Sequence, residues 1–459
     1  MNAGQAGGLP DGPLVAWLGD DFTGSAAVME VLAFAGLPAA LFLDAPTPER
    51  LARFPGLRGI GIATTARAQT PEWMAAYLPR LFASLAETGA PVVHYKTCST
   101  LDSAPHLGSI GTAIDIGQGV IGSPWVPCLV AAPVMRRYQA FGNLFASAPG
   151  GVFRLDRHPV MARHPATPMD EAEVTRHLAR QTARRFGLID IEALEADAEA
   201  TLDRLRAEGC GVIALDAMTG AHMETNGRLI WQGPSPLFAV GSQGVEYALI
   251  AHWRAAGLIP PAAAAPGAGP VARMLAVSGS VSPVTAAQID RAAEEGFEVI
   301  GLDAVAVVRG EAAAEAAAEA AALATLGRGR DALICTARGP EDPAVAALRS
   351  ALDATGTAPE VAGERIGAAL GRIVARLVRR AGLTRVVISG GDTSGHAARE
   401  LGLYAFTALA PTKPGAALLQ AWSDDPAMDG LQIALKGGQM GSPDYFGWIK
   451  KGGGSAGED

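Results

Sequence analysis

The sequence predicts an α/β protein built from two domains with mainly parallel sheets. Three observations support this fold class. The chain has 459 residues, which exceeds the size at which one hydrophobic core stops growing. Short apolar runs alternate with amphipathic stretches in both halves, a pattern typical of βαβ units. Between the halves, residues 259–270 are rich in proline, alanine and glycine and favour neither helix nor strand, so they predict a linker.

The N-terminal domain is expected to span residues 1–258. A helix should follow its first strand and end near Ala35. The predicted strands are apolar runs of four to six residues. They are residues 14–18, 39–43, 59–63, 92–95, 126–131 and 212–215.

The C-terminal domain is expected to span residues 271–450. The alanine-rich run at residues 311–322 is explained by helix propensity alone. The glycine-rich end, residues 451–459, predicts a disordered tail. The predicted strands of this domain are residues 274–277, 298–302, 332–335, 386–388 and 432–435.

Composition excludes several classes of function. The net charge of −9 argues against nucleic acid or an anionic membrane as the main partner and favours a small ligand. The four cysteines lie far apart without a CxxC pair, so neither a zinc cluster nor a disulfide framework is indicated. We find neither a signal peptide nor an apolar run long enough to span a membrane, so we expect a cytoplasmic protein.

Two adjacent acids, Asp20 and Asp21, follow the first predicted strand, with Thr23 and Gly24 behind them. In open α/β sheets ligands bind beyond the carboxyl ends of the strands, so this turn predicts a site. Two neighbouring carboxylates repel each other unless a cation or polar group lies between them. Helix capping is the alternative interpretation, but capping needs only one acid.

A second polar stretch follows the predicted strand at residues 92–95. Lys96 is the expected partner of the two acids or of a substrate carboxylate, and Ser99, Thr100 and Asp102 are candidate substrate contacts. A surface lysine at a strand end is the alternative. Cys98 has no evident base beside it, so we interpret it as a lining residue and not as a nucleophile.

Arginines gather in an otherwise acidic chain around Arg136 and Arg157. Their charge suits an anionic substrate, and we therefore include both as candidate substrate-binding residues. Solvated charge on a loop remains the default interpretation for either of them taken singly.

Three turns containing glycine or hydroxyl side chains follow three predicted strands of the C-terminal domain. Glycine lets backbone N–H groups approach a phosphate, helix N-termini favour anions, and a lysine adds a point charge. Each turn alone is common in α/β proteins, but three at one sheet edge favour a nucleotide site. The candidate nucleotide-binding residues are Ser278, Ser280, Ser282, Gly390, Gly391, Asp392, Thr393, Lys436, Gly437 and Gly438.

With these motifs in order, the chain resembles the four-carbon acid sugar kinase family over nearly its whole length. The resemblance rests on residues 20–24, residues 278–280 with Thr285 and Gln288, residues 390–394 and residues 436–441. It implies a sugar-acid site in the N-terminal domain, ATP in the C-terminal domain and transfer in a cleft between them. It also implies Mg²⁺ with the ATP, although the sequence identifies no metal ligands.

One stretch departs from the family pattern. Cys98 stands where the family usually has an acid, Asp102 where it has arginine, and Ser103 where it has glycine. The charge at Asp102 is therefore reversed, and an arginine contact cannot be carried over. With residues 141–145 and 154–169, this pattern resembles the branch that handles 3-oxo-isoapionate, a branched sugar acid.

The resulting hypothesis is phosphoryl transfer from ATP to a primary hydroxyl of a 3-oxo-isoapionate or 3-oxo-tetronate. Asp20 or Asp21 would accept the hydroxyl proton, while Lys96 and an arginine would hold the substrate. An aldolase or hydrolase acting on sugar acids, and a nucleotide- or sugar-acid-sensing binding protein, remain the alternatives. A dehydrogenase is not favoured, because residues 390–395 do not fit GxGxxG. Homodimer formation is left open.

Overall fold

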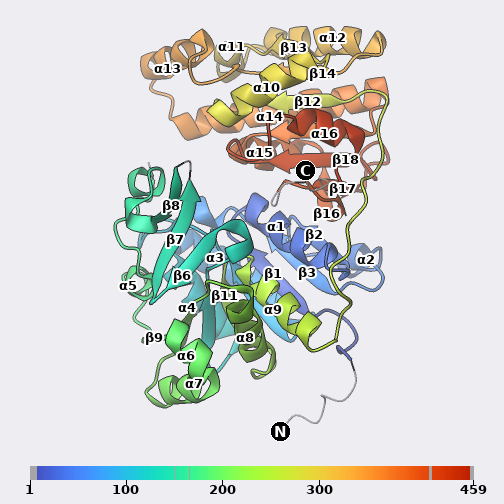
Figure 1. The fold of residues 1–459 in the computed structure, drawn as a ribbon. Coiled ribbons are helices and arrows are strands. Elements are labelled where there is room, and N and C mark those ends of the chain that lie inside the picture. Colours follow the sequence, from blue (N-terminus) through green and yellow to red (C-terminus); the bar gives the residue numbers. More distant parts are fainter. Residues whose placement is uncertain (1–7, 149, 165, 413–415, 455–459) are drawn as a thin grey trace. The chain divides into compact units, whose positions relative to one another are not determined.

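The computed structural model describes residues 8–148, 150–164, 166–412 and 416–454, apart from the side chain of Asp392. The chain divides into two compact units, Met1–Ala263 and Ala264–Asp459, so the division falls inside the predicted linker. Both units combine helices with a mainly parallel sheet, which confirms the predicted α/β class (Figure 1).

The N-terminal unit contains a parallel sheet with the order β2-β3-β1-β4-β11-β5-β10-β9. All six predicted strands are present in it, whereas β9 and β11 were not predicted. The strands are β1 Val15–Gly19, β2 Ala39–Phe42, β3 Gly59–Ala63, β4 Val92–Lys96, β5 Val126–Leu129, β9 Phe186–Ile189, β10 Val212–Leu215 and β11 Leu237–Gly241.

Helices of this unit form two groups, in which α3 packs on α4 and α8 packs on α9. Crossovers between parallel strands are right-handed, so the face that a helix covers depends on the direction in which the chain moves across the sheet. The chain moves one way through α3 and α4 and the opposite way through α8, so the two groups cover opposite faces of the sheet. The helices are α1 Phe22–Ala33, α2 Pro48–Leu51, α3 Pro71–Ala86, α4 Ile110–Ile121, α5 Val174–Ala179, α6 Ile191–Ala196, α7 Ala198–Ala207, α8 Gly220–Trp231 and α9 Gly244–Ala255.

A small antiparallel sheet, β6-β7-β8, lies beside the parallel sheet and was not predicted. It consists of β6 Arg137–Ala140, β7 Asn143–Ala148 and β8 Gly151–Arg154. Its strands are only partly buried, so they lack the continuous apolar runs by which the other strands were found.

The C-terminal unit contains a sheet with the order β13-β14-β12-β15-β18-β17-β16, in which β16 and β17 run antiparallel to their neighbours. The five predicted strands are present and parallel, and the antiparallel pair was missed. The strands are β12 Leu275–Ser278, β13 Glu298–Gly301, β14 Ala332–Cys335, β15 Arg385–Ser389, β16 Leu403–Ala410, β17 Leu418–Ser423 and β18 Gln432–Lys436. One core cluster packs α10 and α16 onto this sheet.

The helices of this unit are α10 Pro283–Glu294, α11 Ala304–Val308, α12 Ala312–Gly327, α13 Pro343–Thr355, α14 Pro359–Ala381, α15 Gly391–Glu400 and α16 Tyr445–Lys451. The alanine-rich run forms α12, and helix propensity is only part of the explanation. Glu315 pairs with Arg372 and Arg376 of α14, and Glu319 pairs with Arg376 and Arg380. These ion pairs fix α12 to its neighbour.

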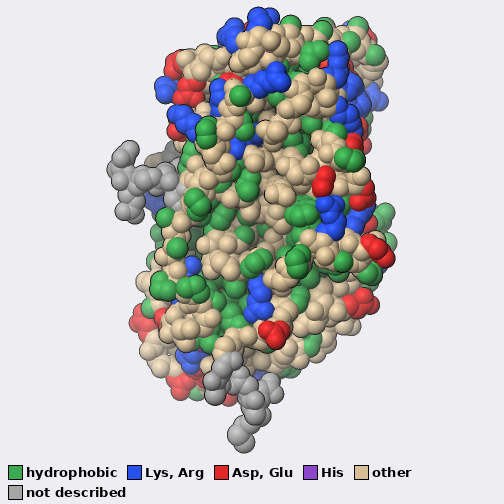
Figure 2. Space-filling model, turned by 90° about the vertical axis from the view of Figure 1, so that its right-hand side faces the viewer, with side chains coloured by type: hydrophobic (Ala, Val, Ile, Leu, Met, Phe, Trp, Pro, Cys, Tyr) green, Lys and Arg blue, Asp and Glu red, His purple; other side chains and the backbone are tan. Residues whose placement is uncertain are grey.

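The expected tail at residues 451–459 begins in ordered structure. Lys451 ends α16, and the backbone N–H of Gly454 donates a hydrogen bond to the Pro411 carbonyl at 2.8 Å. Residues 455–459 lie outside the described residues. No helix in the described part of the chain has the length and apolar character to cross a membrane. On the face drawn in Figure 2, basic and acidic side chains are interspersed.

Candidate functional site

The acid pair lies at the carboxyl end of β1, as predicted. Asp21 is the N-cap of α1, and its Oδ1 accepts a hydrogen bond from the Gly24 backbone at 2.9 Å. Asp20 is 3% exposed, whereas Asp21 is half-buried. Capping therefore accounts for Asp21 in part and does not account for the buried Asp20.

Arg67 holds both carboxylates, and sequence reasoning missed it. Its guanidinium contacts Asp20 through two hydrogen bonds, Nε to Oδ2 at 3.1 Å and a terminal nitrogen to Oδ1 at 2.7 Å. The same terminal nitrogen lies 2.9 Å from Oδ1 of Asp21. Arg67 belongs to a short 3₁₀ turn, Ala66–Ala68, just after β3, so its place beyond a strand next to β1 was the available clue. A cation between the acids was expected, and Arg67 takes that place. Lys96 was expected to partner either the acids or a substrate carboxylate, and the second of these roles stays a prediction.

Burial and charge oppose each other in this cluster. Burial raises the pKa of Asp20, and the Arg67 charge works against that rise. Burial by itself would lower the pKa of Arg67, but Asp20 and Asp21 outweigh it and raise that pKa well above the usual range. The guanidinium is therefore a permanent charge that keeps the two acids together.

Lys96 ends β4 and is 2% exposed. Its Nζ donates a hydrogen bond to the Thr97 carbonyl at 2.6 Å and, among the described residues, forms no ion pair with Asp20 or Asp21. The ammonium lies against Gly24, since a Cβ there would be 2.6 Å from Nζ. Two of the three ammonium donors are therefore available to a ligand. Thr23 is half-buried in the first turn of α1.

The loop after β4 brings three of its side chains into one chain of contacts. Thr100 Oγ1 donates to Asp102 Oδ1 at 3.0 Å and lies 2.9 Å from Cys98 Sγ. Burial raises the pKa of the Cys98 thiol to about 11, and Asp102 adds to the rise. The thiol is thus protonated near neutral pH, and its place as a lining residue stays a prediction. Ser99 in this loop is half-buried.

The two predicted arginines are not gathered at the acid pair. Arg136 and Arg157 are both exposed, and within the described residues neither forms a hydrogen bond or ion pair with Asp20 or Asp21. The charge of Arg157 acts on the neighbouring Asp156. Their role as substrate contacts stays a prediction.

In the C-terminal unit the three turns do come together, because β12, β15 and β18 are neighbours in the sheet. The Gly390 N–H donates to the Lys436 carbonyl at 2.9 Å, and the Gly279 N–H donates to the Ser389 carbonyl at 3.1 Å. Gly390 has a φ of 131°, a conformation that requires glycine. A Cβ at Gly279 would lie 2.5 Å from Thr393 Oγ1.

Hydroxyl groups fasten the first turn to the third. Thr285 Oγ1 donates to the Gly438 carbonyl at 2.9 Å, and Ser282 Oγ donates to the same oxygen. Ser282 also caps α10, as predicted, by accepting the Thr285 N–H at 3.0 Å. Ser280 Oγ accepts from Thr285 Oγ1 at 3.1 Å, and the buried Ser278 Oγ accepts the Ser280 N–H at 3.3 Å.

Lys436 lies at the centre of these turns and is fully buried. Its Nζ is 3.3 Å from Thr285 Oγ1 and 3.2 Å from the Gly437 carbonyl. Burial lowers the pKa of Lys436 to about 8, because a buried site disfavours the charged form of the ammonium. Gly391 begins α15 with open space beside it, and the Asp392 side chain lies outside the described residues.

Two further features bear on ligands. A pocket of about 330 Å³ opens beyond the ends of β13 and β14. In the sheet, β14 is the neighbour of β12. Sequence reasoning did not predict this pocket. Its wall includes Asp303, Thr336 and Arg338. Among the residues that the structure describes, no group of three or more His, Cys, Asp or Glu side chains could hold a metal ion.

The space beside Gly24 yields a testable expectation. Gly24→Ala should weaken binding of the acidic substrate about tenfold or more, because the new Cβ would lie 2.5 Å from Asp21 Oδ1 and 2.6 Å from Lys96 Nζ. Titration calorimetry of the substrate measures the effect. Gly119→Ala, on the exposed side of α4 with nothing within 4 Å, is the control and should leave binding unchanged. Equal affinities for the two variants would contradict the assignment.

Comparisons with known proteins cover both units. A model of a sugar-binding N-terminal domain matches residues 15–249, and a model of a nucleotide-binding C-terminal domain matches residues 275–446. The 3-oxo-isoapionate kinase of Paraburkholderia graminis is 47% identical over 98% of this chain and 97% of its own. The 3-oxo-tetronate kinase of Cupriavidus necator is 30% identical over 96% of this chain and 97% of its own.

A solved structure agrees with these sequence matches. A crystal structure from Salmonella typhimurium LT2, named for a tRNA synthase, has a TM-score of 0.78 and 26% identity. The match covers 95% of this chain and 98% of that chain. The whole two-unit architecture is therefore shared, and not one unit alone.

Proposed function

Because the chain belongs to the four-carbon acid sugar kinase family, we propose that it is an ATP-dependent kinase acting on a primary hydroxyl of a small sugar acid. One observation carries the proposal. The same chain has a carboxylate pair at a sheet edge of its sugar-binding domain and a lysine-centred set of turns at a sheet edge of its nucleotide-binding domain. The first substrate to test is 3-oxo-isoapionate, followed by the 3-oxo-tetronates.

Asp21 is the better candidate for the general base. Both oxygens of Asp20 are occupied by Arg67 and buried, so Asp20 positions the guanidinium. Among the described residues, Asp21 uses only Oδ1 for hydrogen bonds, which leaves Oδ2 for a substrate hydroxyl. A carboxylate within hydrogen-bond reach of the attacking hydroxyl can accept its proton as the phosphoryl group is transferred.

The remaining groups supply binding and charge. Lys96 would hold the carboxylate of the sugar acid through its free ammonium donors. The backbone N–H groups near Gly390, Gly391 and Gly438, with Lys436, would hold the phosphates. Mg²⁺ would arrive on the nucleotide, since it binds substrate phosphates with few protein carboxylates and keeps several of its waters. It would neutralise phosphate charge during transfer.

An ADP-release assay over tetronates, 3-oxo-tetronates and 3-oxo-isoapionate tests the proposal directly. We expect release with at least one 3-oxo acid, and thermal stabilisation by ATP with magnesium but not by NAD. Stabilisation by ATP without ADP release on any of these acids would favour a sensing protein. Turnover of a sugar acid without ATP would favour an aldolase or hydrolase.

ATP affinity should depend on pH through Lys436. With a pKa near 8, this lysine is charged below that pH and loses its charge as the pH rises, so phosphate binding should weaken above about pH 8. Lys436→Met should lower ATP affinity about tenfold to a hundredfold at pH 7 and lose the pH step. Fluorescence titration of ATP from pH 6.5 to 9.5 measures both effects.

The exposed Lys451 provides the control for this prediction. Lys451→Met should bind ATP like the unmodified protein at every pH. A pH step that persists in Lys436→Met would show that another group causes it.

We further propose that the protein works in the cytoplasm, where ATP is available and where its four cysteines, which are free, would stay reduced. Homodimer formation stays a prediction, which light scattering in solution can check.

A further inference from the structure

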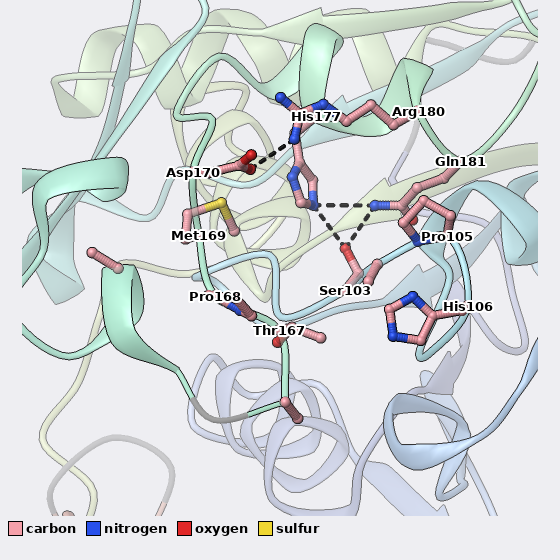
Figure 3. Close-up of a pocket in the computed structure, with 13 residues that line it drawn as sticks. Ser103, Pro105, His106, Thr167, Pro168, Met169, Asp170, His177, Arg180 and Gln181 are labelled. Carbon is pink, nitrogen blue, oxygen red and sulfur yellow. Dashed lines mark hydrogen bonds and ion pairs between the residues drawn. The ribbon is translucent and has the colours of Figure 1, made fainter.

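A second pocket in the N-terminal unit is not used by the mechanism above. It has a volume of about 280 Å³ and lies between the loop after β4, residues 161–170 and α5 (Figure 3). Its wall includes Ser103, Thr167, Asp170, His177 and Arg180. Ser103 and His177 are 3% and 6% exposed, so two of the polar side chains in this wall are buried.

Hydrogen-bonding groups surround Nε2 of His177. Gln181 Oε1 accepts the Gly111 N–H at 3.2 Å, which fixes the amide with its NH₂ group toward the pocket wall. That NH₂ group donates to Ser103 Oγ at 3.0 Å and lies 3.1 Å from His177 Nε2. Ser103 Oγ, which donates its own proton to the Leu101 carbonyl at 3.0 Å, lies 2.9 Å from the same nitrogen. Both of these contacts are therefore made by Nε2.

Nδ1 of His177 is buried and has no hydrogen-bond partner among the described residues. Burial lowers the pKa of His177 to about 4, and the nearby Arg180 charge adds to this, so the ring is neutral at pH 7. A buried polar nitrogen without a partner is unfavourable unless a ligand completes it. This nitrogen therefore indicates a bound oxygen atom.

The other side of the pocket specifies which oxygen fits. In Figure 3 the His177 ring lies between Ser103 and Gln181 on one side and Asp170 and Met169 on the other. Asp170 is paired with Arg180 at 2.7 Å, so the rim carries a carboxylate whose charge is already balanced. A hydroxyl group suits this arrangement, because it can either accept a hydrogen bond from Nδ1 and donate one to Asp170, or donate one to Nδ1. A second carboxylate would face Asp170 and is disfavoured.

We propose that this pocket binds a hydroxyl-bearing branch of the sugar acid through His177 Nδ1, and thereby selects branched over unbranched acids. The proposal rests on the proposed kinase function. Ser103 belongs to the loop that follows Lys96, the last residue of β4. One segment of the chain therefore positions both the Lys96 ammonium, which would hold the carboxylate, and the Ser103 hydroxyl, which contacts His177. Ser103 Oγ lies 2.9 Å from His177 Nε2 and keeps the ring in place.

The test compares two substrates in the full-length enzyme. His177→Phe keeps a flat neutral ring and removes the Nδ1 atom that would bind the hydroxyl, so KM for 3-oxo-isoapionate should rise at least tenfold. KM for a 3-oxo-tetronate, KM for ATP and kcat should change less than twofold. His177→Asn, whose amide can donate near the Nδ1 position, should recover part of the loss.

A surface variant keeps the test valid if substitution of the buried histidine prevents folding. Asp170 is 70% exposed, and Asp170→Ala should raise KM for 3-oxo-isoapionate severalfold without affecting folding. Asp44→Ala is the matched control, since Asp44 is 68% exposed and also pairs with an arginine, Arg80, at 2.7 Å. It should leave both substrates unaffected.

The outcomes separate the two proposals. An enzyme that releases no ADP with any sugar acid overturns the proposed function and this inference with it. An active enzyme in which the His177 and Asp170 variants affect the two acids equally, or affect neither, overturns only the role of the pocket.

Discussion

Asp21→Asn is expected to lower kcat of the kinase reaction by about a hundredfold to ten-thousandfold, the range that general-base catalysis contributes. The amide cannot accept the hydroxyl proton, yet it can still accept the Gly24 N–H and cap α1, because asparagine is as good an N-cap as aspartate. The substitution thus separates catalysis from capping. KM for ATP should change little, and single-turnover measurements of ADP formation test this directly.

Asp190→Asn is the matched control for Asp21→Asn. Asp190 also follows a strand of the same sheet, β9, and caps a helix by accepting the Ala193 N–H at 2.8 Å. This variant should retain full turnover. If Asp21→Asn also retains it, then capping is the whole role of Asp21. A comparable loss in Asp20→Asn with Asp21→Asn active would move the base to Asp20.

Arg67→Met is expected to lower the free energy of unfolding of the N-terminal unit by about 3–5 kcal/mol at pH 7, because it leaves the buried Asp20 carboxylate without a partner. The double variant Arg67→Met/Asp20→Asn should recover much of this loss, since the buried carboxylate is gone and Asp21, which also loses its ion pair, is only half-buried. Urea unfolding of the single and double variants gives the comparison.

The pH dependence of the Arg67→Met defect has a definite sign. Without Arg67, burial raises the pKa of Asp20 in the folded state with less opposition than before. A carboxyl group whose folded pKa lies above its unfolded value destabilises the fold as the pH rises and it ionises. The deficit should therefore be largest near pH 7 and shrink toward pH 4.

Arg80→Met serves as the control for Arg67→Met. Its ion pair with Asp44 is exposed at both ends, so the substitution should cost no more than about 1 kcal/mol. A deficit in Arg67→Met no larger than in Arg80→Met would mean that Asp20 is neutral in the folded protein.

Burial explains part of which strands could be predicted. Most strands found from the sequence contain buried apolar runs, as in β1 and β15, whose five residues are all buried. The partly buried strands of the small sheet, such as β8, carry no such run. Burial is not sufficient, because β11 was missed although its five residues are all buried. The pair β16 and β17 was missed because a βαβ pattern places a helix between successive strands, whereas β17 is the next described element after β16.

The acid pair and the three turns were found because their residues are adjacent in the chain. Their roles in catalysis and ATP binding stay predictions. Arg67 and His177 were missed for the opposite reason. Arg67 is 47 residues from Asp20, and His177 is 74 residues from Ser103, so neither contact leaves a local motif.

The sequence by itself determined the α/β class and the placing of the acids and glycine turns after strands, because apolar periodicity and adjacent polar residues are local properties. Only the tertiary structure decided which cation pairs with the acids, that Lys436 is buried among hydroxyls, and that His177 faces a pocket with an unpartnered ring nitrogen. These facts depend on which strands and loops become neighbours. The charges and hydrogen bonds of a site are therefore completed by residues far apart in the chain.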